Sequence, residues 1–154
     1  MAKASTLFLS LLAAAVGTSC CGTRTTCHLW ASETGVRRSE IEKVLRDNPL
    51  QPNENVRLTE LGQTESVSHY LAQVRVAEPL HIHRTHDLTV FGYRGTGLMT
   101  VGANRFEVGP GDILFIPRGV SHRLENLSRE PAVAVVAFSP RLAEKDFELV
   151  SETK

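Results

Sequence analysis

The sequence lacks any excess of charge of one sign, with 17 basic and 17 acidic side chains in 154 residues. Proteins that bind nucleic acids normally carry a basic excess, so we do not expect a nucleic-acid partner. Cysteine is also scarce, and Cys20, Cys21 and Cys27 all lie in the first 30 residues. No disulfide framework can therefore support the rest of the chain. These absences favour one neutral globular domain that has either a small-molecule partner or none.

The first 20 residues have the order of an export signal. Lys3 supplies a positive start, and residues 7–16 form an apolar run that is shorter than the roughly 20 residues needed to span a bilayer. Gly17, Thr18 and Ser19 then precede Cys20, which resembles a bacterial lipoprotein signal although Gly17 stands where a larger apolar residue is usual. We expect export to the periplasm, either as a secreted protein or with a lipid anchor at Cys20.

Residues 21–54 are expected to form a tether that ends in a short helix. Ser39 and Glu42 have the spacing of a capping box, in which each side chain satisfies a backbone amide of the first turn. Apolar residues follow at helical spacing, which predicts a helix over residues 39–46. Pro49 follows and ends it. Such a helix can either contact a partner or cover one side of the domain.

Residues 55–140 have the pattern of an all-β domain, and residues 141–154 form a C-terminal extension. Short apolar segments alternate with glycine-rich turns at intervals of 8–12 residues, which favours a sandwich or barrel. Strands are predicted around Val56 and Leu58 and over residues 67–76, 88–93, 98–101, 105–108, 113–116 and 132–138. The side chains expected in the core are Phe91, Met99, Phe106, Phe115, Ile116, Val135 and Phe138.

Three histidines have the spacing of a metal site. Side chains two residues apart in a strand point to the same face, so His81 and His83 can approach one ion together. Gly111 and Gly119 bracket another strand with tight turns, and Gly119 tolerates backbone angles that other residues avoid. The chain can then return so that His122 reaches the same ion from a separate strand.

At this point the sequence resembles the cupin superfamily. Residues 111–126 match every defined position of its second motif, which runs Gly, five residues, Pro-x-Gly, two residues, His, three residues, Asn. His81, His83 and Gly95 match part of its first motif. The resemblance implies a double-stranded β-helix, or jelly-roll, barrel. It also implies a divalent metal ion held by His81, His83 and His122.

The first motif departs from the family pattern at its acidic position. Leu88 occupies the place six residues before Gly95, and Asp87 and His86 precede it. A shift of one residue turns a strand side chain to the opposite face unless a bulge or loop redirects it. Three ligand sets remain open: Asp87 as a fourth ligand, His86 as a fourth ligand, or three histidines with open positions for water and ligand.

Imidazole ligands suit Zn, Fe, Mn, Cu or Ni and do not select among them. The leading hypothesis is an exported metal-binding protein that holds a small polar ligand at the ion. One alternative is a metal-dependent dioxygenase or isomerase that acts on a small acid or sugar. Another is a module that senses a metal or ligand without catalysis. The family resemblance also suggests a homodimer.

Overall fold

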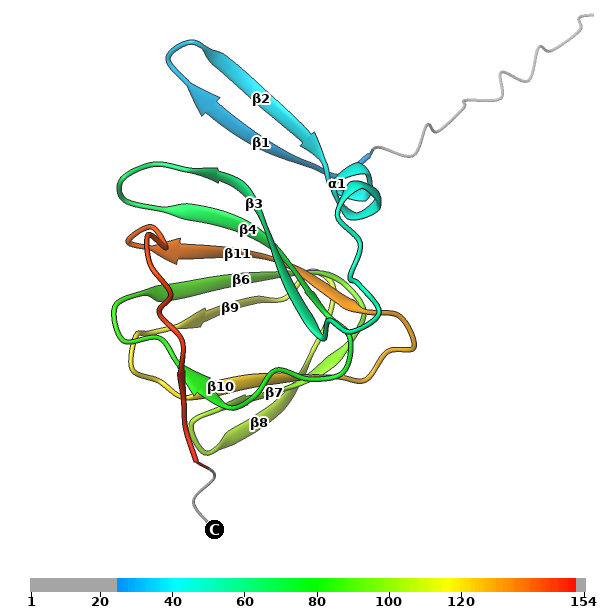
Figure 1. The fold of residues 1–154 in the computed structure, drawn as a ribbon, viewed down its shortest axis with the longest axis vertical. Helices are drawn as coiled ribbons and strands as arrows, with labels where there is room; N and C mark the ends of the chain where they lie inside the picture. Colours follow the sequence, from blue (N-terminus) through cyan, green and yellow to red (C-terminus); the bar gives the residue numbers. More distant parts are fainter. Residues whose placement is uncertain (1–24, 152–154) are drawn as a thin grey trace, which may run out of the picture.

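The computed structural model describes residues 25–151, so the expected signal at residues 1–20, including Cys20, lies outside the described residues. The described chain forms a hairpin, one helix and two five-stranded antiparallel sheets that face each other as a barrel (Figure 1). The predicted all-β fold with a short N-terminal helix is confirmed. Between residues 25 and 151, no helix is long and apolar enough to cross a membrane.

The two sheets are built from strands that are far apart in the chain. In spatial order, the first contains β3 (Val56–Gln63), β4 (Ser68–Val74), β11 (Ala132–Ser139), β6 (Asp87–Arg94) and β9 (Ile113–Ile116). The second contains β12 (Glu148–Leu149), β5 (His81–Ile82), β10 (His122–Asn126), β7 (Gly97–Val101) and β8 (Asn104–Val108). The chain passes back and forth between them, which is the arrangement of a double-stranded β-helix.

Alternating apolar residues fill the space between the sheets. In β9, Leu114 and Ile116 point inward, whereas Ile113 and Phe115 point outward. Full burial of one such side chain contributes roughly 1.5–3 kcal/mol, so this inner layer dominates the stability of the barrel. Its buried members are Ala72, Leu88, Met99, Ile116, Val136 and Phe138.

Three phenylalanines that were expected in the core lie on the surface instead. Phe91, Phe106 and Phe115 are 40%, 37% and 60% exposed. The period of two turns Phe91 and Phe115 away from the barrel interior. Phe106 shares a face of β8 with the cavity-lining Val108, but it remains partly exposed because β8 is an edge strand. In addition, β9 is an edge strand, and its neighbour β6 places Phe91 opposite the exposed Ile113. The outer face of β6 and β9 therefore carries an exposed apolar group formed by Phe91, Ile113 and Phe115.

Helix α1 (Ile41–Asp47) covers the other part of the outer face of this sheet. Ile41 and Leu45 are buried against β3, β4 and β11, where they meet Leu61, Leu71 and Val133. The predicted capping box is wrong, because the helix begins after Glu40 and has no side-chain cap. The carboxylate of Glu42 instead accepts hydrogen bonds from the Tyr93 hydroxyl, at 2.8 Å, and from Arg94.

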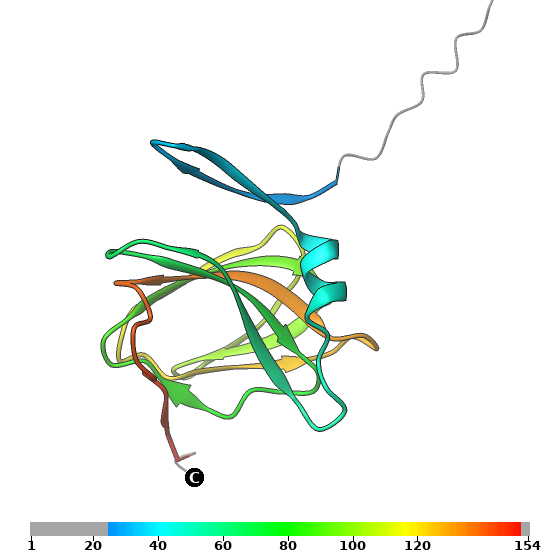
Figure 2. The same cartoon turned by 45° about the horizontal axis from the view of Figure 1, so that its top comes forward.

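The segment expected as a tether forms a hairpin of β1 (Cys27–Ser32) and β2 (Gly35–Glu40) beside the barrel (Figure 2). It contacts β3 and β4 through the Trp30 ring, which lies over Gly62, and through His28, whose Nε2 is 2.8 Å from Nδ1 of His69. Arg37 also donates a hydrogen bond to the Leu61 carbonyl. These contacts hold the hairpin in place although most of its side chains are exposed.

Candidate metal centre

His81, His83 and His122 come together inside one end of the barrel. Each is at most 6% exposed, and each offers a ring nitrogen within 4.8 Å of the others. β5 and β10 pair so that His122 lies opposite His81. Gly119 has a φ of +78° and donates its N–H to the His83 carbonyl at 2.7 Å. The turn between Pro117 and Gly119 therefore brings His122 back to the His-x-His segment, as the motif predicted.

Hydrogen bonds fix which nitrogen of each ring is free. The Nδ1 atoms of His81 and His122 lie 2.8 and 3.0 Å from the carbonyls of Pro79 and Val120. Nδ1 of His83 is bound to the carbonyl of Asp146. Since a carbonyl oxygen can only accept, each Nδ1 carries the proton and each Nε2 keeps its lone pair.

The free nitrogens have the properties of metal ligands. Nε2 of His122 is buried and has no hydrogen-bond partner among the described residues. Burial lowers the pKa of His81 and of His122 to about 4, against the opposing effect of the carbonyl hydrogen bonds, and also lowers the pKa of His83. The three rings are therefore neutral at pH 7. Backbone carbonyls orient them in the manner common for metal-ligating histidines, so the residues present fit a bound cation.

Asp87 is not part of this cluster, which corrects its prediction as a fourth ligand. Its carboxylate accepts hydrogen bonds from the side chain and backbone N–H of Arg118, at 2.8 Å from Nη2 and 2.9 Å from N. The Arg118 guanidinium lowers the pKa of Asp87 to about 2. The side chain of the next residue, Leu88, is buried in the core. No bulge lies at this point of β6, so Asp87 keeps the opposite orientation.

His86 is also engaged elsewhere. Its Nδ1 lies 2.5 Å from a carboxylate oxygen of Asp146, and its Nε2 lies 3.0 Å from the Arg141 carbonyl. Both ring nitrogens thus have protein partners. Of the three ligand sets considered from the sequence, the geometry matches the one with three histidines and no carboxylate.

The C-terminal segment covers this end of the barrel, which the sequence did not predict. β12 pairs with β5, so the C-terminal segment crosses this end of the barrel (Figure 1). The preceding Phe147 stacks on His81 with ring centroids 4.2 Å apart. The Asp146 carboxylate accepts hydrogen bonds from the backbone N–H groups of Arg84 and Thr85, both at 2.9 Å. The segment therefore both orients His83 and closes over the histidines.

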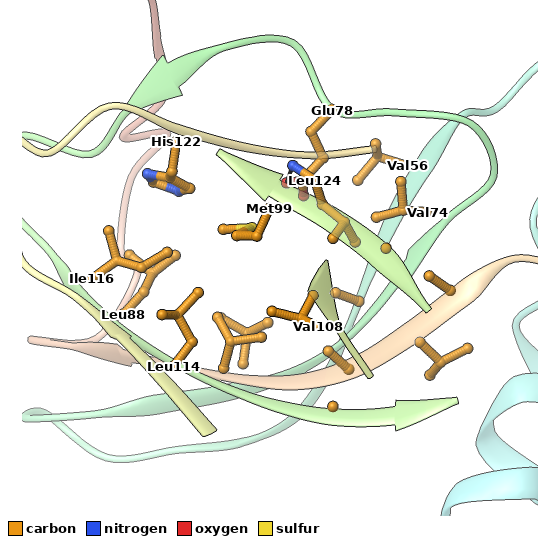
Figure 3. Close-up of a pocket in the computed structure, with 18 of the residues that line it drawn as sticks. Val56, Val74, Glu78, Leu88, Met99, Val108, Leu114, Ile116, His122 and Leu124 are labelled. Carbon is orange, nitrogen blue, oxygen red and sulfur yellow. Dashed lines mark hydrogen bonds between the residues drawn. The ribbon is translucent and has the colours of Figure 1, made fainter. Parts of the chain in front are cut away.

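A cavity of about 220 Å³ extends from the histidines into the barrel. Its wall is mostly apolar, and Figure 3 shows Leu88, Met99 and Leu114 around it. Glu78 brings a carboxyl group into this wall, although it belongs to none of the motifs in the sequence. Burial raises the pKa of Glu78 to about 7, although a hydrogen bond from the Leu124 N–H opposes this. The position of Glu78 directly before Pro79, at the start of the histidine segment, was the available signal.

Comparison with known proteins relates this architecture to one family. A family model described as a cupin domain matches residues 70–138. An uncharacterized protein of Aquifex aeolicus is 32% identical over 107 residues, which cover 70% of this chain and 87% of that protein. The crystal structure of the protein TT1209 from Thermus thermophilus superposes with a TM-score of 0.57 at 26% identity, covering 67% of this chain and 99% of that one.

A more distant neighbour has a named activity. The structure of Lactobacillus farciminis oxalate decarboxylase in a formate complex matches with a TM-score of 0.53 at 19% identity. The match covers 68% of this chain and 34% of that one. At this identity the likeness concerns the fold alone.

Proposed function

Because this chain belongs to the cupin superfamily, we propose that it binds one divalent transition-metal ion through His81, His83 and His122 and holds a small polar ligand beside it. The observation that carries the proposal is the set of three buried imidazoles whose Nδ1 atoms are all occupied by carbonyls. This arrangement leaves three neutral Nε2 donors for the same ion.

The donor set determines what such an ion could do. Three neutral ligands do not reduce its double charge, so a bound ion would attract an anionic oxygen and act as a Lewis acid. Zn, Fe, Mn, Cu and Ni all suit imidazole nitrogen. The apolar wall behind the histidines excludes water from the ligand body, which strengthens the attraction between the ion and a carboxylate. A small organic acid is thus the ligand class that the site favours.

Two uses of this site follow from different features. The protonatable carboxyl of Glu78 in the same cavity favours an enzyme, such as a metal-dependent dioxygenase or isomerase on a small acid or sugar. The alternative is a module that captures or senses a metal or ligand without catalysis. The formate complex of the distant oxalate decarboxylase is in keeping with a small carboxylate as ligand in either case.

The cellular location and the oligomeric state of the protein are proposed from features outside the metal centre. The order of charged, apolar and small residues before Cys20 supports export to the periplasm or lipid attachment to the cell envelope. The exposed apolar group formed by Phe91, Ile113 and Phe115 on β6 and β9 supports a homodimer, because two copies can bury these faces against each other.

Metal analysis of the purified protein tests the site. The wild-type protein is expected to carry close to one equivalent of a transition metal after dialysis, and the His122→Ala variant is expected to carry little. His69→Ala is the matched control, because His69 is a half-buried histidine on the outer side of β4 that contacts His28 rather than the cluster. Full metal content in His122→Ala would contradict the proposed ligand set.

Assays on the metal-loaded protein then distinguish an enzyme from a module that only captures or senses a ligand. Oxygen uptake or isomerisation in the presence of a panel of small acids, phenols and sugars would indicate an enzyme. Binding of the same compounds without turnover would indicate a capture or sensing module.

A further inference from the structure

Glu78 is held at a defined place between β4 and β5. Its backbone N–H donates to the carbonyl of Leu124 at 2.8 Å, and its carboxylate accepts from the backbone N–H of Leu124 at 3.2 Å. The main chain and the side chain of Glu78 are therefore both tied to the same residue of β10. This double attachment fixes the direction in which the carboxyl group points.

The position of Leu124 on β10 indicates how far the Glu78 carboxyl group lies from the metal centre. His122 and Leu124 are two residues apart on β10, and both line the cavity. Two residues of a strand span about 6.6 Å. Glu78 and the histidine cluster thus lie along one wall of one cavity, separated by about the length of a small organic molecule. Figure 3 shows Glu78 and His122 at this cavity, with Met99 and Leu124 also on its wall.

The surroundings of the Glu78 carboxyl leave it with unused hydrogen-bonding capacity. None of the ion pairs between described residues includes Glu78. A carboxylate can accept about four hydrogen bonds, and among residues 25–151 this one accepts a hydrogen bond from the backbone N–H of Leu124. An acidic group in an apolar wall costs stability unless it finds a partner, and its raised pKa reflects that cost. A ligand in the cavity is positioned to supply the missing donor.

We propose that Glu78 selects the ligand by accepting a hydrogen bond from it. The ligand is an organic acid whose anionic end lies at His81, His83 and His122 and whose other end carries a hydroxyl or amino group. A short apolar body joins the two ends and fills the space beside Met99 and Leu124. This inference rests on the proposed function, because the histidine cluster must hold the anionic end.

The competing explanation is that Glu78 only completes the backbone hydrogen bonding of β10. The Glu78→Gln variant separates the two. Its amide oxygen can still accept from the Leu124 N–H, which preserves the structural contact, but its other terminal atom becomes an NH₂ group. That group donates and cannot accept, so a ligand group that only donates loses its hydrogen-bond acceptor there.

Two para-substituted benzoates serve as probes, since the para position places the substituent about one two-residue strand spacing from the carboxylate. 4-Aminobenzoate carries an N–H donor there, and its nitrogen is a poor acceptor because the lone pair is conjugated with the ring. 4-Fluorobenzoate is similar in size but carries no donor. At pH 8, where the Glu78 carboxyl is mostly ionised, calorimetric titration of the zinc-loaded wild-type protein is expected to give about tenfold tighter binding of the amino compound than of the fluoro compound. This is the usual effect of one hydrogen bond to a charged group. Glu78→Gln is expected to reduce this ratio to about one.

Glu107→Gln is the control, because Glu107 is an exposed glutamate on β8. It should keep the wild-type ratio. Equal affinities in the metal-loaded wild type, failure of both probes to bind it, or an unchanged ratio in Glu78→Gln would each overturn the inference. The comparison of the two probes on the wild-type protein needs no variant, so it tests the inference even if Glu78→Gln does not fold. Absence of metal from the wild type would instead refute the proposed function, and the inference with it.

Discussion

Replacing Glu78 by Gln is expected to change how stability depends on pH. Burial holds the pKa of the folded Glu78 carboxyl at about 7, compared with 4.5 for the unperturbed group. Between these values the folded protein keeps a proton that the unfolded chain has released. The stability that Glu78 contributes at low pH is therefore lost as the pH rises from 4.5 to about 7. Glutamine does not titrate, so the variant escapes this loss.

The size of the effect follows from the same two pKa values. One pKa unit corresponds to about 1.36 kcal/mol, so the free energy of unfolding of Glu78→Gln should gain about 3 kcal/mol on the wild type between pH 4 and pH 8. Domains of this size are stable by roughly 5–15 kcal/mol. The expected gain is thus a large part of the total and is easily measured.

Urea unfolding of the metal-free protein across this pH range provides the assay. His81 and His122 act in the opposite direction, because their pKa values of about 4 in the folded state make the protein less stable as the pH falls below 6.5. Both the wild type and the variant contain these histidines. Their contribution therefore cancels when the free energies of unfolding of the two proteins are subtracted at each pH. A difference between Glu78→Gln and the wild type that stays constant across this pH range would refute the argument.

Two further predictions concern the cover of the site and the close packing of the sheet. Phe147→Ala removes the ring that stacks on His81, so transfer of the bound metal to a chelator should become several-fold faster, and an unchanged rate would show that Phe147 does not restrict access. Gly92→Ala would bring a methyl group within 2.1 Å of the Gly109 carbonyl oxygen and should lower the free energy of unfolding by about 2–4 kcal/mol. Gly109→Ala, whose methyl would come no closer than 3.5 Å to Thr96, should cost under about 1 kcal/mol in the same urea titration. Equal losses in the two glycine variants would contradict this interpretation of the packing.

The strands and the three histidines could be predicted because their signals are local. Alternation of apolar residues places each strand, and glycines mark the turns between them. Gly111 and Gly119 indeed adopt φ values of +93° and +78°, which other residues rarely take. The spacing from Gly119 to His122 then determines where the third imidazole enters the barrel.

The orientation of Asp87 was harder to predict, because it depends on a register of one residue. The sequence left open whether a loop or bulge would turn Asp87 toward the histidines. The structure shows a regular strand there, and Arg118 from a different part of the chain takes the carboxylate. An ion pair 31 residues apart in sequence leaves no local pattern.

Glu78 and the C-terminal cover escaped prediction for the same reason. Glu78 precedes β5 in a segment without periodicity, and its burial depends on contacts with Leu124, 46 residues away. Asp146 and Phe147 lie among charged residues, which usually indicates a solvated tail. Only the pairing of β12 with β5 brings them to the histidines.

The short distance between the last described residues and the histidine cluster has a practical consequence for recombinant forms of the protein. β12 ends at Leu149, five residues before the end of the sequence at Lys154, and its partner strand carries His81. A polyhistidine tag fused after Lys154 would follow β12 by five residues and would supply competing imidazoles. Metal stoichiometry measured with such a fusion would count the tag together with the site, so the purification handle belongs elsewhere or must be removed before the measurement.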